Sequence, residues 1–141
     1  MIISLSIART VGGPLVISND PSGDLWLTED VLEPGFEFRY EYAPSSPHMP
    51  GQQLLAAVLE QSTLPAVIYA RGTSTANLRA IKDELTAAVS QFAYDVTLTV
   101  DGDAQTFAAD PTWPQWSSDS GMASSFMAST SLSIRVNPQG A

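Results

Sequence analysis

Hydrophobic and polar residues alternate with a period of two in several segments of the chain, which is the spacing of a half-buried β-strand. The alternation covers residues 1–9, and short apolar runs follow at 15–18 and 25–27. Clusters of glycine, proline, asparagine and aspartate separate these runs and indicate turns. The strictest alternation lies at 36–42, with Phe36, Phe38, Tyr40 and Tyr42 on one face and Glu37, Arg39 and Glu41 on the other. This segment predicts a strand with one aromatic face.

Residues 52–61 fit either a helix or a strand. The strand is favoured, because Gly51 would be a poor helix cap and a strand-like run follows at 64–70. A helix is predicted at about 75–91, with N-cap candidates in 72–75. Its apolar positions recur every three or four residues and should pack against a sheet; they are Leu78, Ile81, Leu85, Val89 and Phe92.

The C-terminal half contains further strand patterns. Two β-rich runs flank Asp101-Gly102, a pair that suits a type I′ hairpin turn because both residues tolerate positive φ. Alternation at 126–136 predicts a long terminal strand. We therefore expect a mainly β fold of the α+β class: an antiparallel β-sandwich or barrel of about seven or eight strands with one flanking helix. The chain, 1–141, is expected to form a single domain with extended loops at about 43–51 and 109–121.

Composition narrows the possible functions. The 141 residues include no cysteine and one histidine, which excludes disulfide scaffolds, thiolate metal sites and multi-histidine metal centres. Six basic residues against 15 acidic ones give a net charge of −9, a poor match for a nucleic-acid-binding protein. No apolar run approaches the roughly 18 residues of a membrane span, and no targeting signal is recognisable. We expect synthesis in a cytoplasm and no membrane insertion.

No residue pattern points to catalysis. His48 lies in a proline-rich loop without a Gly-x-Ser-x-Gly motif, so an exposed loop histidine is favoured over a catalytic base. Asp101 and Asp103 fit a turn better than a fragment of a metal site. A carboxylate pair for glycoside hydrolysis has no specific signal among 15 acids. We expect no catalytic residue, no cofactor and no metal.

Interaction surfaces are the better candidates. The proline-rich loop offers Pro44, Pro47, His48, Met49 and Pro50. Trp113 and Trp116 could stack on sugar rings, anchor an interface, or pin their own loop over the sheet, and the last is the commonest role. An acidic stretch contains Asp20, Asp24, Glu29 and Asp30; it suits a solvated loop or a subunit contact.

Three stretches carry a family resemblance: EPGFEFRYEYAP at 33–44, QLLAAVLEQ at 53–61 and VSQFAYDVTLTVDG at 89–102. With these stretches, residues 33–141 resemble small minor tail proteins of long-tailed bacteriophages that infect actinobacteria. The order of strands, helix, hairpin and long terminal strand is similar to the N-terminal domain of distal tail proteins, which form a ring at the tip of the tail tube.

The resemblance implies a tail-tube-like β fold and a structural role in the virion, as a hexameric ring that serves as hub or adaptor between the tail tube and distal tail proteins. It implies contacts with itself and with tube, tape measure, hub or fibre proteins, with DNA only as passing cargo. The proline-rich loop and the Trp113–Trp116 segment would reach neighbouring copies, and the acidic residues would face a lumen. Six copies at −9 each carry about −54, which would repel passing phosphate. Alternatives are a tail-tube or tail-terminator subunit and a carbohydrate-binding module on the phage surface.

Overall fold

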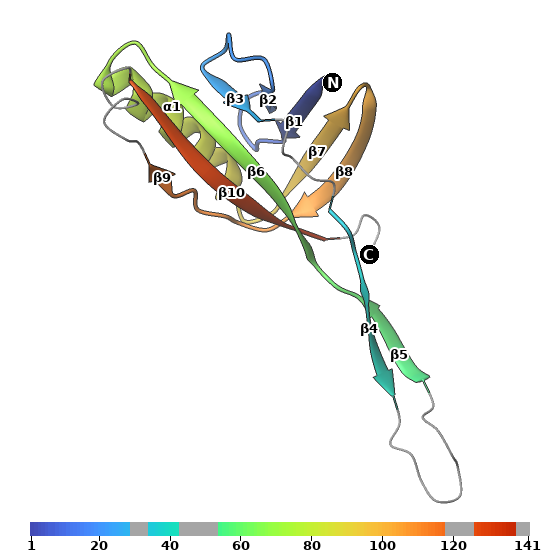
Figure 1. Ribbon diagram of the computed structural model, residues 1–141. Helices are drawn as coiled ribbons and strands as arrows, with labels where there is room; N and C mark the ends of the chain where they lie inside the picture. The colour runs from blue at the N-terminus through green and yellow to red at the C-terminus, as the bar shows by residue number, and fades with distance from the viewer. Residues whose placement is uncertain (29–33, 43–53, 118–125, 138–141) are drawn as a thin grey trace, which may run out of the picture.

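The computed structural model describes residues 1–28, 34–42, 54–117 and 126–137 (Figure 1). Its elements, in chain order, are β1 (Ile3–Ile7), β2 (Leu15–Ser18), β3 (Leu25–Leu27), β4 (Phe38–Tyr42), β5 (Leu54–Leu59), β6 (Ser62–Arg71), α1 (Thr75–Val89), β7 (Tyr94–Val100), β8 (Asp103–Ala109), β9 (Trp116–Ser117) and β10 (Met127–Asn137). The strand predicted within 52–61 is confirmed by β5. The predicted loop at 43–51 lies outside the described residues, and β9 falls within the loop predicted at 109–121.

The main sheet closes into a barrel. Its strands follow the order β6-β3-β2-β1-β7-β8-β10-β9, and a further pairing of β6 with β10 joins seven of them into a ring. The pairings are antiparallel except for a short parallel contact at which Ser18 faces Trp26. The predicted barrel with one flanking helix is confirmed.

The core follows from the strand periodicity. In β1, Ile3, Leu5 and Ile7 are buried, while the serines between them are partly exposed. In β10, every second residue from Ala128 to Val136 is buried. The β7–β8 turn has positive φ at Asp101 (49°) and Gly102 (87°), as the type I′ prediction requires. Alternation therefore fixes which face of each strand enters the barrel.

Helix α1 begins where the sequence predicts. The Ser74 hydroxyl accepts a hydrogen bond from the Asn77 backbone N–H (3.1 Å), and the Asn77 side-chain oxygen accepts one from the Thr73 N–H (2.9 Å). These bonds satisfy N–H groups at the helix start. Just before the cap, a Cβ on Gly72 would lie 2.6 Å from the Leu78 nitrogen, so the turn into the helix requires glycine.

The apolar stripe of α1 is shorter than predicted. Ile81, Leu85, Ala88 and Val89 are buried against the barrel. The helix ends at Val89: its last α-helical hydrogen bond runs from the Ser90 N–H to the Thr86 oxygen at 3.0 Å, and the backbone leaves the helical conformation at Ser90 (φ −93°, ψ 2°). Phe92 therefore leaves the helical stripe and is 90% exposed. Its predicted place in the buried face is wrong.

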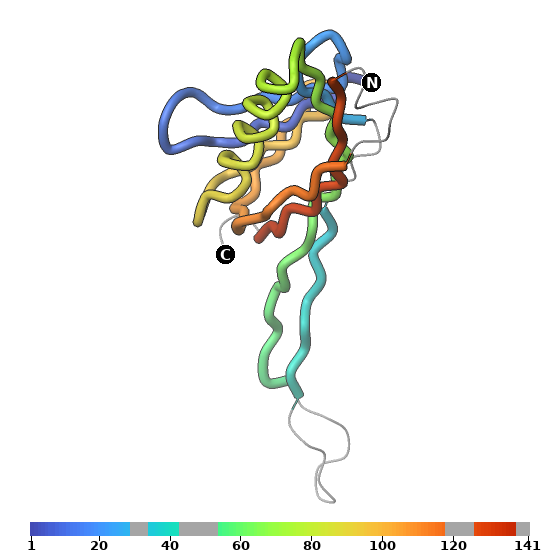
Figure 2. Tube along the Cα trace, turned by 90° about the vertical axis from the view of Figure 1, so that its left-hand side faces the viewer, coloured from blue at the N-terminus to red at the C-terminus, as the bar shows by residue number. Residues whose placement is uncertain are grey.

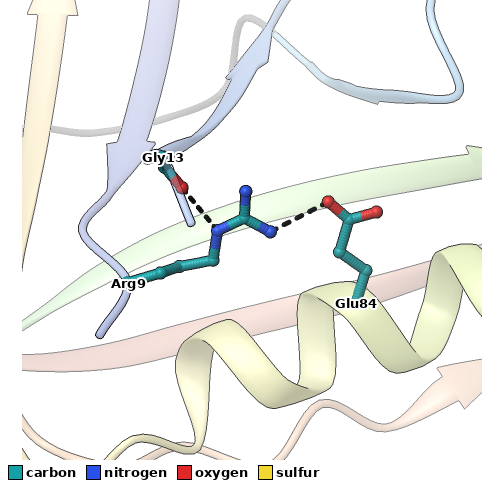
Figure 3. Close-up of polar contacts among 3 residues, drawn as sticks. All are labelled: Arg9, Gly13 and Glu84. Carbon is teal, nitrogen blue, oxygen red and sulfur yellow. Dashed lines mark hydrogen bonds and ion pairs between the residues drawn. The ribbon is translucent and has the colours of Figure 1, made fainter. Parts of the chain in front are cut away.

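A polar clasp ties α1 to the β1–β2 loop (Figure 3). The Arg9 guanidinium donates to the Gly13 oxygen at 2.7 Å and pairs with the Glu84 carboxylate at 3.0 Å. Beside it, the Gln91 side chain accepts from the Thr10 N–H at 3.0 Å and donates to the Ala8 oxygen at 2.8 Å. These contacts hold the C-terminal half of α1 against the chain that joins β1 to β2.

Strands β4 and β5 form a separate two-stranded sheet. Both views show this hairpin projecting away from the barrel (Figures 1 and 2). We call β4 and β5 together the arm. Phe36 anchors its base, because its ring is only partly exposed and packs against the core residue Phe107 with 5.8 Å between ring centroids. The arm is thus joined to the core at one end and surrounded by solvent along β4.

Candidate assembly surface

The alternating sequence of β4 produces the aromatic side of the arm. Phe38 pairs with Leu59 and Tyr40 with Ala57, and directly opposite residues of an antiparallel pair share a face. The centroid of the Tyr40 ring lies 6.1 Å from that of Phe38 and 6.2 Å from that of Tyr42. The rings form a continuous row. We call Phe38, Tyr40 and Tyr42, with Leu59 and Ala57 opposite, the aromatic face.

The three rings of the aromatic face are each about half exposed. Phe38 and Tyr40 are each 53% exposed and Tyr42 is 48% exposed. An aromatic side chain presents about 200 Å² when fully accessible, so the three rings leave about 300 Å² in solvent. An apolar patch of this order equals the largest patch on a typical soluble protein, and such patches are often functional. An isolated two-stranded hairpin is also marginally stable in water, so a covering partner would stabilise the arm.

The opposite face of the arm is charged. Arg39 lies 3.6 Å from the Glu41 carboxylate and 3.8 Å from that of Glu60. Both pairs are exposed and contribute little to stability. Glu37 and Glu60 flank the base of the arm, where the Glu37 carbonyl accepts from the Glu60 N–H at 2.9 Å. Together with its base, the arm therefore combines an apolar face with three acidic side chains and one basic one.

A second surface lies between α1 and the chain at 113–116. This open groove has a volume of about 550 Å³ and is lined by Arg79, Lys82, Asp83, Thr86, Ala87, Ser90, Trp113, Pro114 and Trp116; we call it the Trp113 groove. The Thr112 N–H donates to the Val89 oxygen at 2.7 Å, which fixes the segment beside the end of the helix. Trp113 is 68% exposed and offers its indole to the groove.

The two tryptophans have different environments. Trp116 lies in β9, faces Thr130 of β10 and is partly buried against the core. Trp116 therefore holds its own segment on the sheet. Trp113, in contrast, is accessible to a partner molecule. Trp113 is thus the more accessible of the two tryptophans, and an interface role for either stays a prediction.

Two cations line the Trp113 groove. In the described part of the chain, neither Arg79 nor Lys82 forms an ion pair, in contrast to Arg9 and Arg39. They stand three positions apart on α1, so they project from one side of the helix. On a chain with a net charge of −9, this groove is a place where positive charge is concentrated.

The acidic candidates divide between described and undescribed residues. Asp20 and Asp24 lie exposed in the β2–β3 turn, while Glu29 and Asp30 lie outside the described residues. The Asp20 carboxylate accepts from the Ser22 N–H at 3.0 Å, and this hydrogen bond lowers its pKa. Ser22 thus accounts for the orientation of Asp20, and whether these acids face a lumen stays a prediction.

The remaining predicted residues fall into two groups. Pro44, Pro47, His48, Met49 and Pro50 all lie outside the described residues. Asp101 accepts a hydrogen bond from the Ile2 N–H at 2.7 Å, which joins the β7–β8 turn to the start of β1. Among the residues that the structure describes, no three acidic, histidine or cysteine side chains gather as metal ligands. No helix in the same residues is long and apolar enough to cross a membrane.

Sequence reasoning missed two features of the surface. The alternation at 36–42 predicts the aromatic face but not its exposure, because a period of two is the same for a strand in a barrel and for one in a projecting ribbon. In the sequence, Arg79 and Lys82 are interpreted as part of the solvent-exposed polar side of an amphipathic helix. Only the position of Trp113 beside that helix turns them into part of a groove.

The fold has a counterpart among solved structures. No protein-family model and no curated protein sequence matches the chain. A chain in the structure of the phage P2 baseplate, in its activated conformation with Ca, is similar over 98% of this chain, with a TM-score of 0.58 and 10% sequence identity. The match covers 44% of that baseplate chain, so this chain spans less than half its length. At this identity the likeness extends to the fold: the barrel, helix and arm described above have the fold of part of a phage baseplate protein.

Proposed function

We propose that this protein is a structural component of a bacteriophage tail tip and that its copies assemble into a ring. In this role the ring would act as a hub or adaptor between the tail tube and the distal tail proteins, and a six-membered ring is our working stoichiometry. The role is structural and involves no catalytic step. The protein would reside in the tail of the virion after synthesis in the host cytoplasm.

The observation that carries the proposal is the exposed aromatic face on an arm that projects from a barrel of baseplate-protein fold. A chain that functions alone gains nothing from about 300 Å² of aromatic surface in water, because the exposure is unfavourable and promotes association. An assembly subunit uses such a surface to bind its neighbour. The arm and the compact barrel also present different surfaces, which is the requirement for the head-to-tail contacts that generate rings.

The charge of the chain is compatible with a tail component that encloses a passage. Six copies at −9 each carry about −54, before counterions are counted. A negative wall repels DNA phosphates, so the genome would pass without binding. The same charge suits a tail-tube or tail-terminator subunit, and position along the virion separates these roles.

Light scattering on the purified chain tests the proposal. A ring of six copies of 15.0 kDa has a mass of about 90 kDa. We expect this mass, or that of another closed ring, at micromolar concentration and above. A mass of one copy at every concentration up to the solubility limit would contradict the proposal.

The exposure of Trp113 favours a second candidate, a carbohydrate-binding surface. An accessible indole beside Asp83, Lys82 and Thr86 offers both a stacking face and polar groups for sugar hydroxyls. A glycan array probed with the wild type and with Trp113→Ala tests this role. Binding that is lost in the variant supports it, and no binding to any glycan removes it.

A further inference from the structure

We propose that the aromatic face of the arm of one copy docks into the Trp113 groove of the next copy. The inference rests on the proposed ring and names the two surfaces that would build it. The occupant of the groove is therefore a second copy of this chain.

The two surfaces match in chemistry. The arm offers the rings of Phe38, Tyr40 and Tyr42, and the groove offers the indole of Trp113 with Pro114 and Ala87 beside it. Aromatic pairs gain beyond simple burial, and tryptophan and tyrosine are enriched among the residues that dominate interfaces. Arg79 and Lys82 add cations that are attracted to the faces of tyrosine rings.

Electrostatics favours the groove over other parts of the surface. Two copies with a net charge of −9 each repel one another, so a contact gains where the local charges are opposite. Glu41 and Arg39 lie on the arm, and Glu37 and Glu60 flank its base, so this part of the molecule carries three acidic side chains against one basic one. The groove brings Arg79 and Lys82, without ion-pair partners among the described residues, together with one acid, Asp83. An acidic ribbon thus meets a locally basic groove.

Geometry excludes a contact within one copy. The arm leaves the barrel at Ser62, the first residue of β6, and projects away from it (Figures 1 and 2). The segment that lines the groove runs along the barrel away from the arm, because the Asp110 N–H donates to the oxygen of Arg135, which pairs with Thr63, whereas Trp116 pairs with Thr130, which pairs with Ile68. Five residues of extended chain separate Thr63 from Ile68, so the segment extends about 17 Å along β6 in the direction opposite to the arm. The arm of one copy therefore reaches only the groove of another.

This contact joins two different surfaces, so each copy has one donor site and one acceptor site. Repetition of such a contact produces a ring when the rotation between copies closes, and a filament when it does not. A symmetric pairing of arm with arm would instead stop at a dimer. The distinction provides a direct test.

Two variants test the two surfaces one at a time. Tyr40→Ala damages the arm and leaves the groove intact, while Trp113→Ala damages the groove and leaves the arm intact. Both side chains are strongly exposed, so both variants should fold with the melting temperature of the monomeric wild-type barrel. Val11→Ala removes an 87% exposed apolar side chain that belongs neither to the aromatic face nor to the lining of the Trp113 groove, and it serves as the control.

Sedimentation-velocity ultracentrifugation at micromolar concentration, on the single variants and on their equimolar mixture, is the experiment. We expect each variant alone to remain monomeric at concentrations at which the wild type and Val11→Ala assemble. The mixture should form dimers of one copy of each kind and nothing larger, because one intact contact remains. Trp113→Ala rings equal to the wild type, or a mixture that stays monomeric, would overturn this inference while leaving the ring in place. A wild type that never assembles would contradict the proposed function itself.

Discussion

Replacement of Tyr40 by alanine provides a quantitative test of the aromatic face. The ring is 53% exposed, so about half of its roughly 200 Å² is free to be covered by a neighbour. Burial of about 100 Å² at about 25 cal/mol per Å² contributes about 2.5 kcal/mol to each contact. Loss of that contribution weakens each contact about 60-fold, since 1.4 kcal/mol corresponds to tenfold.

The same replacement should hardly affect folding of the barrel. The aromatic neighbours of Tyr40 are the arm residues Phe38 and Tyr42, and the side chain lies outside the buried core. Val58→Ala is the matched control, because Val58 is 43% exposed on the same arm but faces Arg39 on the opposite side. Sedimentation equilibrium across a concentration series measures the association constant of each variant. Equal weakening by Tyr40→Ala and Val58→Ala, or no weakening by either, would refute the assignment of the binding face.

Three further predictions concern the barrel. Leu85→Ala removes a fully buried helix side chain and should lower the free energy of unfolding by about 2–5 kcal/mol, measured by urea denaturation. Gly72→Ala places a Cβ 2.6 Å from the Leu78 nitrogen and should lower the melting temperature by several degrees; an unchanged value would show that the turn relaxes freely. Burial raises the pKa of Tyr94 to about 12; the charge of Asp110 adds to this shift, and the nearby Thr112 hydroxyl opposes it. Because the folded pKa exceeds the unfolded value of 10.0, stability is retained below pH 10 and about 2–3 kcal/mol is lost as pH rises to 12. Tyr94→Phe should lack this loss in urea denaturation between pH 9 and 12, and a wild-type slope in the variant would contradict it.

The strand periods of the sequence determine most of the barrel. Alternation at Ile3, Leu5 and Ile7 and along 126–136 predicts both strands and their buried faces. The Asp101-Gly102 turn carries its own conformational requirement and so identifies the β7–β8 hairpin. These features are local, which is why one sequence suffices to predict them.

The sequence does not predict features that depend on where a helix ends or on contacts between segments that are distant in the sequence. The stripe of α1 continues in sequence to Phe92, but the backbone turns after Val89 and leaves that ring in solvent. The two tryptophans look equivalent in sequence, and only the pairing of Trp116 with Thr130 separates them. The same limit applies to the groove, which exists because the segment after β8 lies along α1.

Electron microscopy of the purified chain would show the ring and its contacts together. We predict closed rings with an open centre, in which each arm spans to the adjacent barrel and ends at its Trp113 groove. Class averages that contain only single barrels with free arms, or dimers joined arm to arm, would contradict it.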